Sequence, residues 1–94
     1  MFDAIIEGNE VLLSGRFDAS QVEIAKNAFN QVDRSFDVNF KDLDYISSAG
    51  LSVLLATQKR LSQTGDKLKL KNLNSHIREV FKYAGFVMIF EIVE

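Results

Sequence analysis

The sequence contains no cysteine and no proline, and each absence narrows what the protein can be. Without cysteine there are no disulfides, no thiolate zinc sites and no cysteine nucleophile. Without proline or any low-complexity stretch, nothing marks a linker between domains. The 94 residues therefore predict one domain over residues 1–94, a length that can bury one modest core without covalent staples.

The chain also has no large excess of either charge sign and no long apolar run. The chain has 11 basic and 13 acidic side chains, a formal net charge of −2, which is not the basic footprint of a nucleic-acid-binding protein. No apolar run approaches the roughly 18 residues typical of a membrane span, and the first residues do not form a signal peptide. We expect a soluble cytoplasmic protein with no nucleic-acid partner and no direct membrane insertion.

The periodicity of apolar residues predicts strands that alternate with helices. The turn residues Gly8-Asn9 join two strands, at residues 2–7 and 10–13, into a hairpin. Ser20 is expected to start a helix, because Glu23 completes a capping box with it. The later elements are expected as strands at residues 37–40, 67–71 and 87–93 and helices at residues 48–64 and 75–84.

The resulting order, β-β-α-β-α-β-α-β, predicts an α/β fold. Because helices connect the later strands, we expect a mixed, mostly parallel sheet with an N-terminal hairpin and helices packed mainly on one face. Gly65 is expected to end the second helix. The alternating Lys67, Lys69 and Lys71 are typical of a half-exposed or edge strand, and we expect a solvated edge.

Small polar residues gather where the second helix is expected to begin, at Ser47-Ser48-Ala49-Gly50. In α/β sheets, functional side chains usually follow the carboxyl ends of strands, which indicates residues 42–51 and 15–20. The two loops are neighbours if their strands are adjacent. A serine at a helix start can cap the helix, or it can carry a phosphate that the free N–H groups and the helix dipole favour.

Other chemistry is possible in these loops. The carboxylates of Asp18, Asp42 and Asp44 are candidate ligands for a divalent cation, although aspartate is also common in loops that bind nothing. A serine hydrolase built on Ser48 lacks the G-x-S-x-G turn. The one histidine, His76, lies at another helix start with no orienting acid beside it. We therefore expect neither a metal site nor catalysis.

The apolar side of the second helix offers a possible docking surface. Leu51 lies in its first turn and is expected at the surface beside the serines. Leu54 and Leu55 are expected to pack in the core instead.

Two segments resemble motifs of the STAS domain family, and in particular its single-domain anti-sigma-factor antagonists. Gly15-Arg16-Phe17-Asp18 is similar to the family's Gly-x-Leu-Asp after the second strand. Residues 39–51 are similar to the family's strand followed by Asp-(Leu/Val)-x-(Phe/Tyr)-(Ile/Met)-Asp-Ser-(Ser/Ala)-Gly-Leu. Gly65 and Gly85-Phe86 also fit the family's pattern, so the resemblance covers essentially the whole chain.

The resemblance implies a regulator of transcription that switches partners and needs no cofactor. Ser48 takes the position of the phosphorylated serine, with Ser47 as the second choice. In the family, the unphosphorylated antagonist binds an anti-sigma factor that is also a serine kinase, and the sigma factor is freed. The phosphorylated form lets go, and a metal-dependent serine phosphatase resets it. The positions near the family's interface are Asp18, Asp44, Ser47, Gly50, Leu51 and Ser52.

The sequence departs from the family at Ser47, where aspartate is usual. A charge beside the acceptor hydroxyl is thereby missing, and a second hydroxyl takes its place. The resemblance also admits another class, because some stand-alone STAS proteins are accessory subunits of membrane ABC transporters, including lipid-trafficking ones. In that class the surface of the second helix docks on the ATPase, and Ser48 need not be phosphorylated.

Overall fold

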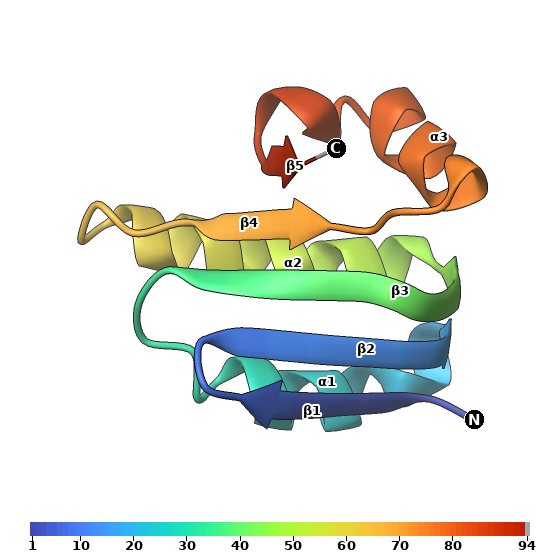
Figure 1. Cartoon of the computed structure of the whole chain (residues 1–94), viewed down its shortest axis with the longest axis horizontal. Helices are drawn as coiled ribbons and strands as arrows, with labels where there is room; N and C mark the ends of the chain where they lie inside the picture. Colours follow the sequence, from blue (N-terminus) through green and yellow to red (C-terminus); the bar gives the residue numbers. More distant parts are fainter. Residues whose placement is uncertain (94) are drawn as a thin grey trace.

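The computed structural model describes residues 1–93 and builds them around one five-stranded sheet (Figure 1). The strands lie side by side in chain order: β1 (Asp3–Glu7), β2 (Glu10–Phe17), β3 (Phe36–Ile46), β4 (Leu68–Lys71) and β5 (Glu91–Val93). β1 pairs antiparallel with β2, and the pairs from β2 to β5 are parallel. The expected hairpin and mixed, mostly parallel sheet are confirmed.

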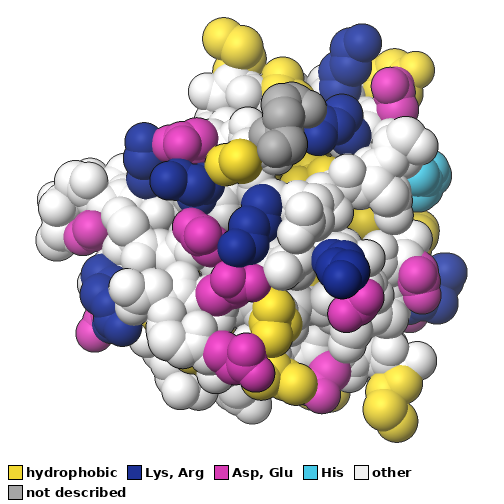
Figure 2. All heavy atoms as spheres, viewed as in Figure 1, with side chains coloured by type: hydrophobic (Ala, Val, Ile, Leu, Met, Phe, Trp, Pro, Cys, Tyr) yellow, Lys and Arg dark blue, Asp and Glu magenta, His cyan; other side chains and the backbone are white. Residues whose placement is uncertain are grey.

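The helices connect the parallel strands. They are α1 (Val22–Phe29), α2 (Ser48–Ser62) and α3 (Ser75–Tyr83), with short 3-10 turns η1 (Ala19–Gln21) and η2 (Phe86–Met88). Helices α1 and α2 run along one face of the sheet, whereas α3 lies past β4 near β5 (Figure 1). The opposite face of the sheet is open, and acidic and basic side chains interleave on it (Figure 2). The two candidate loops lie where β2 runs into η1 and α1 and where β3 runs into α2.

Local signals end helix α2 as expected. Gly65 has a φ of +80°, which glycine adopts without strain. Its N–H donates to the Ser62 carbonyl at 3.2 Å, and the N–H of Asp66 donates to the Leu61 carbonyl at 3.0 Å. These two bonds form a Schellman motif that satisfies the last carbonyls of the helix.

Strand β3 extends beyond the residues 37–40 expected for it. Its register against β2 shifts between Leu12 and Ser14 and again between Gly15 and Arg16, and each shift places an extra residue in β3. Such bulges interrupt the alternation of apolar and polar residues, which is why the pattern predicts a shorter strand. Asp42 and Asp44 consequently lie within the strand and are exposed, not in a loop.

The start of α1 also differs from the expectation. Asp18, not Ser20, is the capping residue, and its carboxylate accepts the Ser20 N–H at 3.0 Å to begin η1. Helix α1 then begins at Val22, and the residue before it makes no side-chain cap. The capping box at Ser20 and Glu23 is therefore wrong, because a 3-10 turn takes up that position.

The lysine-rich strand is not the edge of the sheet. β4 pairs with β3 on one side and β5 on the other, so the expected edge position is wrong. Lys67 forms an ion pair with Glu91 at 2.5 Å, and Lys71 forms one with Glu10 at 2.9 Å on the open face. The Lys71 hydrogen bond lowers the pKa of Glu10, and the same contact raises the pKa of Lys71.

The last strand is shorter than expected. Residues 87–93 were expected to be extended, but the first part of this stretch forms η2, and β5 begins only at Glu91. Phe81 and Phe90 explain the difference, because their rings lie 5.8 Å apart and both are buried. The turn brings Phe90 back onto α3 before the chain can join the sheet.

Candidate functional site

The ends of β2 and β3 meet at one edge of the sheet and bring the two candidate loops together. Phe17 and Ile46 are paired in register, and the N–H of Ser47 donates to the Phe17 carbonyl at 2.9 Å. Asp18 directly follows Phe17, so it lies beside the loop that carries Ser47 and Ser48. The expectation that the two loops are neighbours is confirmed.

Gly50 sets how closely α2 approaches these strands. It is buried, and a Cβ atom at this position would lie 2.9 Å from Ile46 Cγ1 and 3.0 Å from Phe17 Cγ. Such distances are shorter than side-chain packing allows, so only glycine lets the helix start rest on the ends of both strands. The height of the first turn of α2 above the sheet is determined by this contact.

The two serines have different roles at the helix start. Ser47 is the N-cap: its backbone is extended, and its Oγ accepts the Gly50 N–H at 3.2 Å. Ser48 is the first residue of the helix and is exposed. Its Oγ makes no hydrogen bond with any residue from 1 to 93, and its carbonyl accepts the Ser52 hydroxyl at 3.1 Å. Of the two serines, Ser47 therefore caps the helix and Ser48 does not.

Asp18 supplies a fixed negative charge next to this helix start. Its Oδ1 accepts two hydrogen bonds from Ser20, one from the hydroxyl at 2.5 Å and one from the N–H at 3.0 Å. The Ser20 hydroxyl has the largest effect in lowering the pKa of Asp18, and the positive charge of Arg16 acts in the same direction. Asp18 is therefore ionised near neutral pH.

The other expected contact residues divide into exposed and buried ones. Asp44 on β3 and Ser52 on α2 are exposed, whereas Gly50 and Leu51 are buried. Leu51 is only 6% exposed, so its expected surface position is wrong. It faces the sheet together with Leu54, one turn further along the helix, which is fully buried as expected. Leu55 is only partly buried, so its expected core position is wrong. The role of these residues in binding a partner stays a prediction.

The alternative chemistries find little support in this arrangement. Within residues 1–93 no three His, Cys, Asp or Glu side chains are grouped so that they could hold a metal ion. Asp18, Asp42 and Asp44 thus do not form a cation site. His76 is an exposed residue in the first turn of α3, a helix that Asn74 caps by accepting the Ile77 N–H at 2.8 Å.

One pair near the site was not expected from the sequence. The Arg16 guanidinium lies 4.3 Å from the centre of the Tyr45 ring, and the two residues are paired in register. This cation–π contact places a positive charge beside Asp18. The motif Gly15-Arg16-Phe17-Asp18 contained the signal, but the partner of Arg16 depends on the bulged register of β3.

Comparison with known proteins agrees with this geometry. The family model described as "Mlab, STAS domain" matches residues 5–91. BtrV of Bordetella bronchiseptica, assigned as an anti-sigma factor antagonist, is 37% identical over 92 residues, which cover 98% of this chain and 77% of BtrV. The anti-sigma-B factor antagonist of Bacillus subtilis is 36% identical over 52 residues, 55% of this chain and 48% of that protein.

Solved structures share the fold. The anti-sigma factor antagonist SpoIIAA in its unphosphorylated form superposes with a TM-score of 0.72 at 18% identity, covering 100% of this chain and 88% of the other. An anti-sigma factor antagonist from Mycobacterium paratuberculosis superposes with a TM-score of 0.79 at 15% identity, covering 98% and 83%. No helix within residues 1–93 is both long and apolar enough to cross a membrane.

Proposed function

Because this chain belongs to the STAS domain family and its relatives are anti-sigma factor antagonists, we propose that it is a partner switch controlled by phosphorylation of Ser48. With a free hydroxyl it binds an anti-sigma factor that is also a serine kinase, which releases the sigma factor. The kinase transfers the γ-phosphoryl group of ATP to Ser48 Oγ, leaving ADP and a proton, and the complex separates. A metal-dependent serine phosphatase then restores the hydroxyl. The chain itself acts by binding, without catalysis or a cofactor.

The exposed and unbonded hydroxyl of Ser48 is the observation that carries this proposal. A phosphate on it adds about −1.5 to −2 charges at the N-terminus of α2, where the helix dipole favours an anion. The domain can therefore be phosphorylated without unfolding.

The same charge opposes binding. A dianion in the centre of a close protein interface is costly unless a cation matches it. Two carboxylates already lie at this end of the sheet, the exposed one of Asp44 and the ionised one of Asp18, and Arg16 offsets part of the charge of Asp18. Phosphorylation of Ser48 adds to that charge, so a partner that tolerates the unmodified surface is expected to reject the modified one.

Ser47 is the weaker candidate for the acceptor. Its Oγ is engaged by the Gly50 N–H and the residue is only partly exposed, so modification there competes with the cap of α2. The hydroxyl of Ser48 makes no such bond. The geometry thus favours Ser48 even though Ser47 stands where the family usually has aspartate.

The test is phosphorylation by the kinase of the same organism. Incubation with kinase and ATP should add one phosphate, about 80 Da by mass spectrometry, and Ser48→Ala should abolish it. Ser48→Asp should weaken kinase binding at least tenfold, whereas Ser48→Ala should bind like the wild type. Ser62→Ala is the matched control and should change neither result, because it removes an exposed hydroxyl at the far end of α2, outside the expected interface.

Two outcomes would count against the proposal. Labelling that survives in Ser48→Ala and is lost in Ser47→Ala would move the phosphorylation site. Equal binding of the kinase to Ser48→Ala and Ser48→Asp would show that a negative charge at Ser48 does not control partner binding. A pull-down from native cells is the third comparison. If Ser48→Ala and Ser48→Asp bring down the same transporter ATPase equally well, the accessory-subunit class is favoured instead.

A further inference from the structure

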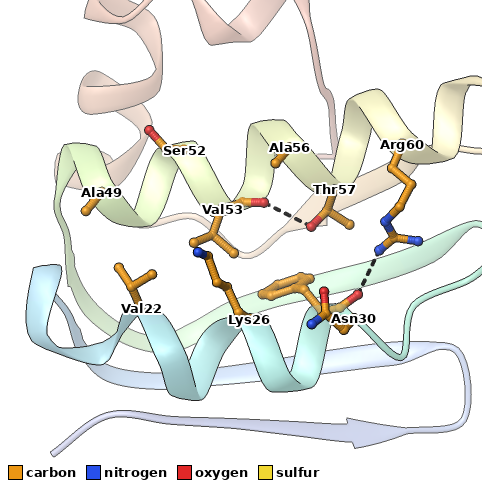
Figure 3. Close-up of a pocket in the computed structure, with 10 residues that line it drawn as sticks. Val22, Lys26, Asn30, Ala49, Ser52, Val53, Ala56, Thr57 and Arg60 are labelled. Carbon is orange, nitrogen blue, oxygen red and sulfur yellow. Dashed lines mark hydrogen bonds between the residues drawn. The ribbon is translucent and has the colours of Figure 1, made fainter.

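A groove of about 540 Å³ runs between α1 and α2 on the helix-covered side of the molecule (Figure 3). Its apolar lining consists of Val22, Phe29, Ala49, Val53 and Ala56. Thr57 adds its methyl group, because its hydroxyl is engaged by the Val53 carbonyl at 2.9 Å. The groove exists because α2 presents mostly small side chains toward α1, so the two helices do not close the space between them.

The charged side chains that line the groove are both basic. The Arg60 guanidinium donates to the carbonyls of Phe29 and Val32 at 2.9 and 2.8 Å and closes the groove at the C-terminal end of α1. Lys26 extends from α1 toward Val53 of α2 (Figure 3) and forms no ion pair within residues 1–93. The N-terminus of α2 adds positive potential beside Ala49. An apolar floor is thus combined with an unmatched positive charge.

We propose that this groove binds a small organic anion with an apolar tail, of the class of medium-chain carboxylates. The tail lies on the floor between the helices, and the carboxylate pairs with the Lys26 ammonium. Small-molecule sites are typically concave, about 300–1,000 Å³, mostly apolar and equipped with a few polar groups, which describes this groove. Residues 49–60 of α2 extend it over about 16 Å, enough for an extended chain.

The proposal is independent of phosphorylation at Ser48. It adds a ligand to the opposite side of α2 from the residues that face the sheet, and it would hold for a domain that is never phosphorylated. Ala49 and Ser52 line the groove and adjoin Ser48, so a bound ligand lies next to the start of α2.

The test is an NMR titration of the labelled protein with three probes that share one chain length: decanoate, decanol and decyltrimethylammonium, each below its micelle concentration. Decanoate should give saturable amide shifts at Val22, Lys26, Ala49 and Ala56. Decanol should bind about fivefold more weakly, since one exposed charge pair contributes up to about 1 kcal/mol. The cationic probe should not shift these amides.

Two variants test the residues directly. Lys26→Gln should bring decanoate binding down to the level of decanol, whereas Lys59→Gln, a control on the outer side of α2, should leave it unchanged. Ala56→Leu should fill the groove and abolish decanoate binding. Because Ala56 is exposed and leucine is a good helix former, this variant should keep the thermal stability of the wild type.

Several results would overturn the proposal. They are equal binding of the three probes, unchanged decanoate binding by Ala56→Leu, the absence of any saturable shift, and shifts centred on the exposed Val87, Met88 and Ile89 near η2. If no probe binds but Ala56→Leu weakens the kinase complex, the groove is a protein-docking surface and not a site for small anions. The Ser48 phosphorylation assay keeps that outcome separate from a failure of the switch.

Discussion

Replacing each of two adjacent serines by alanine should separate helix capping from phosphorylation. Ser47→Ala removes the acceptor of the Gly50 N–H, whereas Ser48→Ala removes a hydroxyl that bonds to no residue from 1 to 93. We therefore expect Ser47→Ala to lower the free energy of unfolding. Ser48→Ala should stay within about 0.5 kcal/mol of the wild type, as for most surface substitutions.

The structure sets the size of the Ser47 effect. Loss of a serine N-cap costs about 0.5–2 kcal/mol. The bond to Gly50 is 3.2 Å, at the long end of the N–H···O range, and Ser47 is partly exposed, so water can replace part of it. We expect a loss of about 1 kcal/mol, which lowers the Tm of a domain of this size by about 4–8 °C. Ser47→Asn keeps an acceptor and should recover most of the loss.

The assay is urea and thermal unfolding of the unphosphorylated proteins, followed by the kinase reaction on the same samples. Ser47→Ala should be less stable and still labelled, and Ser48→Ala should be fully stable and unlabelled. The reasoning is refuted if Ser48→Ala loses stability while Ser47→Ala does not. That result would make Ser48 the helix cap and Ser47 the residue with the free hydroxyl, and Ser47 would then be the better candidate for the phosphoacceptor.

Three other substitutions test the packing and the charges. Gly50→Ala should lower the free energy of unfolding by about 1–3 kcal/mol in urea, because its Cβ would meet the Phe17 ring, and an unchanged midpoint would contradict that contact. Phe81→Ala should cost about 3–5 kcal/mol by the same measurement, because the ring is fully buried against other aromatic rings. Lys71 lowers the pKa of Glu10, so their pair stabilises the fold above the ordinary carboxyl pKa and is lost as the pH falls through the lowered value. The stability difference between Lys71→Met and the wild type should therefore shrink from about pH 6 to about pH 3, and a constant difference would exclude this pairing.

Features with a local cause were predictable from the sequence. The hairpin at Gly8-Asn9 and the end of α2 at Gly65 depend on backbone conformations that glycine adopts easily, so the residue itself carries the signal. The order of strands and helices followed from the apolar periodicity. These elements need no knowledge of what lies beside them in space.

Features that depend on a neighbour were not predictable in the same way. The alternation of Lys67, Lys69 and Lys71 indicates one polar face, but it cannot show whether a strand has one partner or two. β4 became an interior strand because the few residues of β5 pair with it. Likewise, the bulges that place Asp42 and Asp44 within β3 exist only in the pairing with β2.

The sequence alone determined the chemistry of the candidate site: two hydroxyls, a glycine and nearby carboxylates at the start of a helix. The tertiary structure decided how these groups are used. In the folded chain, Ser47 is the helix cap and the Ser48 hydroxyl is free. Leu51 is buried in the core, and the hydrogen bond from the Ser47 N–H to the Phe17 carbonyl joins the two loops. The physical reason is that residue types are local, whereas hydrogen-bond partners and burial are settled by the register of strands and the approach of α2 to them.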